Sequence, residues 1–160
     1  MDASYINPVV QGTQRVCTTL FKETPVLGKV YVKTRPYNTS PVTVSIDIIG
    51  NFDGEIVYNM DETTGRYIAS QMMHGMAVDN LSDNFMAQSS LAEVGNIISG
   101  NIATIFAGKG ILVDIKPPQF RFNANESDFP IVSRLLAIIC VPLHFANGNV
   151  LQVDILIPPK

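Results

Sequence analysis

The amino-acid sequence predicts an α+β fold in which a mainly antiparallel sheet packs against helices. Two pairs of strand-like runs are each joined by a short polar turn, at 51–54 and 146–149, as in β-hairpins. Two longer segments instead place apolar residues three or four positions apart, which is typical of amphipathic helices. No linker or low-complexity stretch divides the chain, so we expect one domain over residues 1–160.

The first helix is expected to begin at Asn7. Asparagine is a favourable N-cap, and Pro8 then occupies the preferred first helical position. Apolar residues continue at helical spacing to about Lys22, and Pro25 follows. These signals predict an amphipathic helix that covers one face of the sheet.

Strands and a short helix follow. Alternating residues predict a strand over 28–33, and β-branched residues predict a first hairpin from 42–49 and 55–59. Asp61 then suits the N-cap of a short helix that runs to about His74 and ends at Gly75.

The last third of the chain reads as strands and loops. A strand over 111–115 precedes two prolines, and a polar loop follows over 123–128. A second hairpin is expected from 132–145 and 150–157. Pro142 has no N–H to donate to a neighbouring strand, so we expect it at a sheet edge or a bulge.

Composition excludes several classes of function. The net charge is −3 and no basic stripe or basic amphipathic helix occurs, which argues against binding nucleic acid or a membrane surface. The longest apolar run, 135–141, is too short to span a bilayer, and the N-terminus lacks a signal-peptide pattern. We therefore expect a soluble cytoplasmic protein.

The cysteines and histidines do not predict a metal site. Cys17 and Cys140 lie far apart in apolar runs, as buried free thiols do, and no CxxC pair occurs. His74 and His144 also lack metal-ligand spacing. We expect all four residues to be structural.

The longest predicted helix starts after Ser82 and runs to about Ala107. At about 100° per residue its apolar residues fall in one sector of roughly 80°, which must face the core. These residues are Leu91, Val94, Ile98, Ile102 and Ile105.

A second set of residues lies on the opposite side of this helix, within about 60° of one another. The set comprises Ser89, Glu93, Asn96 and Gly100. Together they offer a carboxylate, a carboxamide that can donate and accept, and a position where another surface could approach the backbone. Spacing alone favours an ordinary solvated face that contains an incidental glycine.

The segment 89–101 resembles the signature of the CheC/CheX/FliY phosphatases. That signature has Asp or Ser, three residues, Glu, two residues and Asn, often with Gly-Asn one turn later. The matching positions here are Ser89, Glu93, Asn96, Gly100 and Asn101. The likeness extends over nearly the whole chain, through 6–8, 28–33 and 141–143. Only one ExxN helix is visible, so the sequence is most similar to the CheX type.

A possible internal duplication of this helix is consistent with the resemblance to the CheX type. The run 17–21 has a pattern similar to 102–106, and in that register Glu93 corresponds to Pro8 and Asn96 to Gln11. If the first helix is a second copy, it has lost the acid.

The resemblance implies a CheC-like fold and a phosphatase that hydrolyses the phosphoaspartate of a CheY-like receiver domain, in chemotaxis or a related two-component pathway. Asn96 would orient the attacking water and Glu93 would pair with a receiver lysine. Ser89, Gly100 and Asn101 would contact the substrate protein. The resemblance implies no cofactor of the chain's own, since Mg²⁺ belongs to the receiver, and it implies a homodimer joined through sheet edges, with edge candidates around the final hairpin.

Two alternatives remain. The same fold could serve as a non-catalytic receiver-binding, flagellar-switch or scaffold module, because a fold does not fix a function. A nucleotide-binding enzyme is disfavoured: the Gly-Lys-Gly at 108–110 follows a helix, and Ala103 and Gly110 replace the Gly and Ser/Thr of a phosphate loop.

Overall fold

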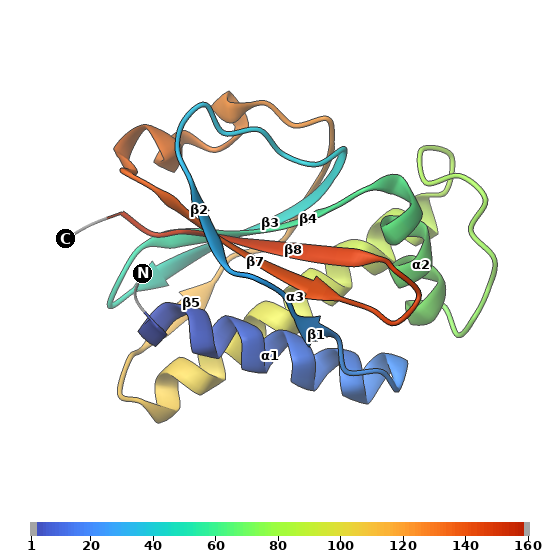
Figure 1. The fold of residues 1–160 in the computed structure, drawn as a ribbon, viewed down its shortest axis with the longest axis horizontal. Coiled ribbons are helices and arrows are strands. Elements are labelled where there is room, and N and C mark those ends of the chain that lie inside the picture. The colour runs from blue at the N-terminus through green and yellow to red at the C-terminus, as the bar shows by residue number, and fades with distance from the viewer. Residues whose placement is uncertain (1–2, 159–160) are drawn as a thin grey trace.

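The computed structural model describes residues 3–158, which form an antiparallel sheet and three α-helices (Figure 1). The ends of the predicted 1–160 domain lie outside the described residues. In chain order the elements are α1 (Ala3–Phe21), β1 (Val26–Leu27), β2 (Tyr31–Lys33), β3 (Val42–Gly50), β4 (Gly54–Met60), α2 (Glu62–Met72), α3 (Phe85–Gly108), β5 (Val113–Ile115), β6 (Gln119–Phe122), η1 (Glu126–Asp128), η2 (Pro130–Arg134), β7 (Ile138–His144) and β8 (Val150–Leu156). The predicted α+β class with a mainly antiparallel sheet is confirmed.

The sheet has the strand order β1-β7-β8-β4-β3-β5, with β2 also paired to β7 and β6 also paired to β3. Both predicted hairpins are present: β3 pairs with β4 from Ile48↔Gly54 onward, and β7 pairs with β8. The final hairpin is not at an edge, because β1 and β2 cover the outer side of β7. The expectation of a free edge there is therefore wrong for the described residues, and the edge lies on β1 and β2 instead.

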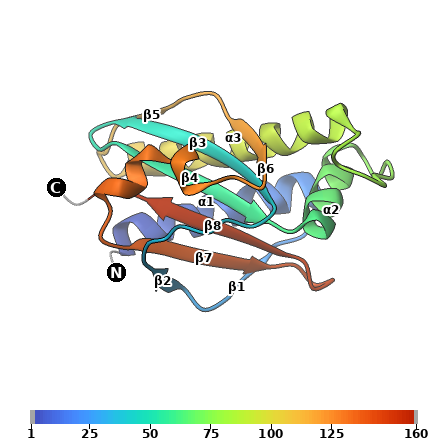
Figure 2. The ribbon, with the colours of Figure 1, turned by 90° about the horizontal axis from the view of Figure 1, so that it is seen from above.

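The two faces of the sheet are covered differently. α1 and α3 lie side by side against one face and enclose the larger core (Figure 2). The other face is covered by the loop 34–41 and the two 3-10 helices, around the buried rings of Tyr37 and Phe129. Strand residues alternate between these faces, so β3, β4 and β8 direct their apolar side chains mainly toward the helices.

Two helix starts differ from the prediction. α1 begins by Ala3 rather than at Asn7, so Pro8 lies inside the helix. The proline is tolerated because it falls near the start, where few backbone hydrogen bonds precede it. α3 begins at Phe85 with Asn84 as its cap, whose Oδ1 accepts from Ala87 N at 2.9 Å. Ser82 instead hydrogen-bonds to Asn80 in the preceding turn.

The cap predicted for the short helix is confirmed. Asp61 accepts a hydrogen bond from Thr64 N at 2.7 Å and opens α2, which ends at Met72. Gly75 follows in a turn with a φ of +85°, a conformation that favours glycine.

Several strand boundaries were also wrong. β2 covers only part of 28–33, β5 covers only part of 111–115, and β1 and β6 were not predicted. β7 starts at Ile138 rather than at 132, because 130–134 form the 3-10 helix η2. These errors concern short segments whose conformation depends on tertiary contacts rather than on local pattern.

Pro142 lies within β7, which has neighbours on both sides, so of the two predicted positions the edge is wrong. Between the paired stretches, residues 28–30 oppose the two residues 141–142, so one extra residue lies opposite the proline, as in a bulge. The proline falls in the gap between the stretches paired to β1 and to β2. Its carbonyl accepts from Gly28 N at 2.9 Å across this gap. An N–H group at this position would point to the same side, where no residue of β1 or β2 is paired with it, so its absence from proline leaves no strand acceptor without a donor.

Within the described part of the chain, no helix has the length and apolar character needed to cross a membrane.

Candidate functional site

The helix α3 is held against the sheet by a close approach at Gly95. A Cβ atom added there would lie 2.8 Å from Val44 Cγ1 and 3.4 Å from Tyr58 Cδ2. One turn later the hydroxyls of Ser99 and Tyr58 share a buried hydrogen bond of 2.8 Å. These contacts fix the rotation of α3 about its axis and therefore determine which residues face solvent.

The neighbouring helix fixes the position of α3 from the side. Gly12 of α1 meets Ile102, since a Cβ at Gly12 would lie 2.7 Å from Ile102 Cγ1. The predicted apolar stripe is buried at Leu91, Val94, Ile98 and Ile102. Ile105 is only half-buried, and Phe106 is buried in its place.

The outward side of α3 carries the predicted site residues. Ser89 and Glu93 are exposed, and Asn96 and Gly100 are half-buried. Asn96 is therefore not enclosed in the hydrophobic interior. The side chains of Glu93 and Asn96 make no hydrogen bond or ion pair with any described residue, although both have strong hydrogen-bonding groups. A carboxylate and a carboxamide thus lie about one turn apart, open to a partner.

Gly100 and Asn101 differ in their freedom. A Cβ at Gly100 would meet nothing within 4 Å, so the backbone there is open to an approaching surface. The side chain of Asn101 instead donates through Nδ2 to Ile97 O at 3.2 Å within its own helix. Its second amide hydrogen and its Oδ1 remain available to another protein without loss of that bond.

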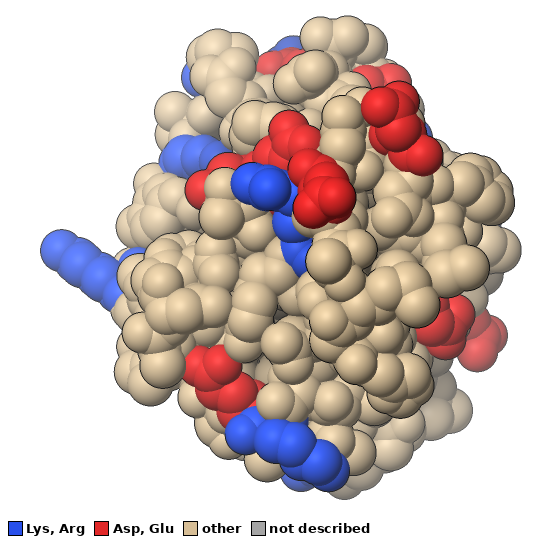
Figure 3. All heavy atoms as spheres, turned by 90° about the vertical axis from the view of Figure 1, so that its right-hand side faces the viewer, with Lys and Arg blue, Asp and Glu red and all other residues tan. Residues whose placement is uncertain are grey.

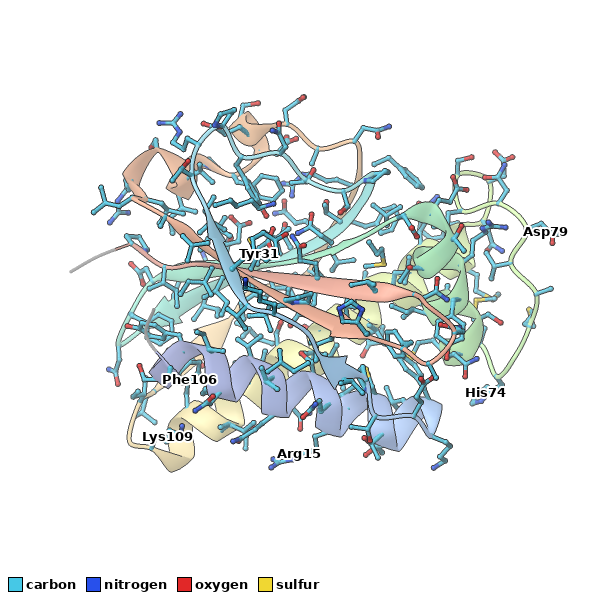
Figure 4. All side chains as sticks on the ribbon, in the orientation of Figure 1. Arg15, Tyr31, His74, Asp79, Phe106 and Lys109 are labelled. Carbon is cyan, nitrogen blue, oxygen red and sulfur yellow. The ribbon has the colours of Figure 1, made fainter. Side chains whose placement is uncertain are left out.

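The proposed copy of this helix presents different chemistry. In α1 the position matched to Glu93 is the buried Pro8, and the position matched to Asn96 is the exposed Gln11. The charged residue of α1 is Arg15, on the side turned away from the sheet (Figure 4). α1 therefore offers a carboxamide and a cation, without an acid.

No group of three or more His, Cys, Asp or Glu that could hold a metal ion occurs among residues 3–158. His74 lies in the turn after α2, at one end of the molecule (Figure 4), whereas His144 packs beside Gly28. Cys17 and Cys140 are free, buried thiols, as predicted. Burial raises the pKa of each to about 12, so neither is activated as a nucleophile.

Polar residues also gather on the sheet face away from α3, a feature that the sequence analysis missed. The carboxylate of Asp154 is fully buried and accepts from Tyr37 Oη at 2.7 Å, Asn59 Nδ2 at 2.9 Å and Gln152 Nε2 at 2.9 Å. Burial raises the pKa of Asp154, opposed by Lys33, whose Nζ lies 3.7 Å away. The alternating polar residues of β4 and β8 could have indicated this set.

Beside this network, a hollow of about 340 Å³ lies over β3 and β4. Asp47 and Glu55 line it as cross-strand neighbours. Burial and, to a lesser extent, the charge of Asp47 raise the pKa of Glu55 to about 7. Both carboxylates lie across the sheet from α3, so they do not belong to the candidate site.

Comparisons with known proteins agree on one family. A family model described as "Chemotaxis phosphatase CheX" matches residues 42–134, more than half of the chain. The protein named CheY-P phosphatase CheX from Thermotoga maritima is 27% identical over 118 residues, 74% of this chain and 75% of that protein.

Solved structures share the fold over almost the entire chain. The CheX-CheY-BeF3-Mg²⁺ complex from Borrelia burgdorferi contains a chain that is 28% identical, with a TM-score of 0.78 and coverage of 97% of this chain and 98% of that one. A CheC-like superfamily protein from Shewanella sp. PV-4 is 19% identical, with a TM-score of 0.80 and coverage of 99% and 100%. The latter supports the fold alone.

Proposed function

The chain belongs to the CheX family of chemotaxis phosphatases, and from this premise we propose that it hydrolyses the phosphoaspartate of a CheY-like receiver domain. The observation that carries the proposal is the pair Glu93 and Asn96, which lies on the open side of α3 without a partner in the described chain. The related T. maritima protein is named as a CheY-P phosphatase, and the related B. burgdorferi structure is a complex with CheY.

We assign Asn96 the role of orienting the attacking water. Hydrolysis of an acyl phosphate requires water to attack phosphorus in line with the oxygen of the leaving carboxylate. The new oxygen–phosphorus bond forms as the bond to the aspartate breaks, which releases inorganic phosphate and free aspartate. Positioning supplies most of the catalysis in such a transfer. The Oδ1 of Asn96 would accept a hydrogen bond from the water and hold it on this line.

Glu93 is assigned to docking. Its negative charge would repel a phosphoryl group, so it suits a cation of the receiver better than the reacting atoms. Because Glu93 is exposed and has no cation beside it within residues 3–158, it is available for a lysine of the partner. Ser89, Gly100 and Asn101 would lie at the edge of the same contact.

The remaining parts of the proposal concern cofactors and assembly. The Mg²⁺ required for the reaction would be held by the receiver, and the chain would need no cofactor of its own. A homodimer through β1 and β2 is consistent with their position at a sheet edge. Cytoplasmic location follows from the proposed partner, since receiver domains act there.

Replacement of Asn96 by Ala tests catalysis. We expect stimulated dephosphorylation to fall by about a hundredfold or more, because the water loses its orienting group. The measurement is the decay of phosphate on the CheY-like receiver domains of the source organism. Gln11→Ala is the matched control, because it removes an exposed carboxamide from α1. Wild-type turnover by Asn96→Ala would refute the assignment.

The same time course distinguishes a phosphatase from the alternative, a non-catalytic receiver-binding or scaffold module. Such a module would bind an activated receiver and leave the lifetime of its phosphate unchanged. Glu93→Ala should weaken binding and activity together, and an unchanged affinity would remove the docking role of Glu93.

A further inference from the structure

The first turn of α3 exposes two large apolar side chains. Phe85 is 80% exposed and Met86 is 61% exposed. They precede an outward face that is almost without charge, because Glu93 is the one charged residue among the 24 of α3. A solvated helix face normally carries several Lys and Glu residues, whereas the centre of a protein interface loses them and gains aromatic residues and Met.

The spacing places this apolar turn in line with the candidate site. Phe85, Ser89 and Glu93 are four residues apart and therefore lie on one side of the helix. At 1.5 Å per residue Phe85 is about 12 Å from Glu93 along the axis and about 16 Å from Asn96. A standard interface of about 800 Å² per partner, if roughly circular, has a radius of about 16 Å. A receiver centred on the site would therefore reach Phe85.

We propose that Phe85 and Met86 are the apolar anchor by which α3 recognises its receiver domain. This inference rests on the proposed function, because it assigns the partner of the same helix face. The two side chains would contribute to receiver binding and not to the chemical step. They lie at the N-terminal end of α3, far from Asn96 along the helix axis.

The charges around this turn favour a receiver over other occupants. The segment 73–108 contains Asp79, Asp83 and Glu93 but no Lys or Arg, so it does not suit an anionic membrane surface. A second copy docked face to face would bring the same acidic residues together. At the end of the molecule where α3 starts, acidic and basic side chains adjoin in a few clusters, with broad uncharged areas between the clusters (Figure 3). A partner with a cation for Glu93 and an apolar surface for Phe85 fits this arrangement.

The test uses kinetics with the CheY-like receivers of the source organism, and affinity for each receiver activated by BeF3 and Mg²⁺. We expect the double variant Phe85→Ser, Met86→Ser to raise Kd and KM about tenfold or more, with kcat nearly unchanged. Leu136→Ser is the matched control, because Leu136 is 82% exposed and lies on the opposite side of the sheet, between η2 and β7. Its kinetics should equal those of the wild type.

The outcomes separate this inference from the proposed function. A wild-type protein that shortens the phosphate lifetime, combined with a double variant of unchanged Kd and KM, would overturn the anchor and leave the function intact. A wild-type protein that affects no receiver would overturn both. A double variant that changes the oligomeric state in sedimentation, while Kd stays constant, would assign the turn to a second copy and contradict the inference.

Discussion

Polar side chains have opposite surroundings on the two sides of the sheet. On the outward face of α3, Glu93 and Asn96 have no partner within residues 3–158. On the other side of the sheet, the buried carboxylate of Asp154 accepts hydrogen bonds from three side chains. The two regions therefore differ in whether their polar groups are satisfied inside the chain.

This difference separates structural polar residues from residues available for binding. A buried polar group that lacks a partner costs about 1–3 kcal/mol, so the residues around Asp154 must bond to one another for the fold to be stable. An exposed group has no such requirement, because water satisfies it until a partner arrives. Substitutions should therefore affect stability at Asp154 and recognition or catalysis on α3.

The largest stability effect is expected for Asp154→Ala. The change leaves Tyr37, Asn59 and Gln152 without their shared acceptor and Lys33 without its nearby anion. We expect the free energy of unfolding to fall by about 3–5 kcal/mol, as when one partner of a buried charged network is removed. Urea denaturation measures this loss. Turnover per folded molecule should remain near that of the wild type.

Asp154→Asn is the matched control, because it keeps the side-chain volume and one acceptor oxygen. It should lose less stability than Asp154→Ala. A loss confined to Asp154→Ala, with Asp154→Asn as stable as the wild type, would mean that the side chain contributes through its volume and not through its charge and second acceptor oxygen, which would contradict the contrast with α3.

A smaller and pH-dependent effect is expected at Glu55. Its pKa is about 7 in the folded chain, above the ordinary value of 4.5. Between pH 4.5 and 7 the unfolded chain therefore releases a proton that the folded chain retains, so stability falls as pH rises through this window. Glu55→Gln should remove this dependence and raise stability above pH 7 by about 2–3 kcal/mol, somewhat less than the full pKa shift because solvent reaches the hollow.

Unfolding midpoints at pH 5, 6, 7 and 8 test this prediction. Asp53→Asn is the control, because Asp53 is an exposed carboxylate that lines the same hollow. It should keep the wild-type slope. A Glu55→Gln variant with an unaltered slope would show that another group dominates the titration.

Much of α3 could be predicted because its signals are local. The 3.6-residue period identified the buried residues Leu91, Val94, Ile98 and Ile102, and it placed Glu93 on the open side. The roles of Glu93 and Asn96 came from family resemblance and remain predictions. The start of α3 was placed too early because Ser82 and Asn84 are both good caps, and only the tertiary path of the turn selects Asn84.

The other side of the sheet was less predictable. Strand alternation indicates that Glu55, Asn59 and Asp154 share a face, but such a face is ordinarily solvated. The loop 34–41 and the 3-10 helices cover it, and no local pattern in those segments predicts this. β6 was missed for the same reason, since its pairing with β3 depends on a long-range contact.

The smallest effects are expected from two glycines of α3, of which Gly95 faces the sheet and Gly100 faces outward. Gly95→Ala places a Cβ 2.8 Å from the buried Val44, so we expect a loss of about 1–3 kcal/mol from overpacking. Gly100→Ala meets nothing within 4 Å, and the better helix propensity of alanine should add about 1 kcal/mol. Thermal or urea unfolding would measure both. If the receiver approaches the backbone at Gly100, the stabilised variant should also show a higher KM. Destabilisation by Gly100→Ala would contradict an open outer face, because it would require a contact within the chain at this position.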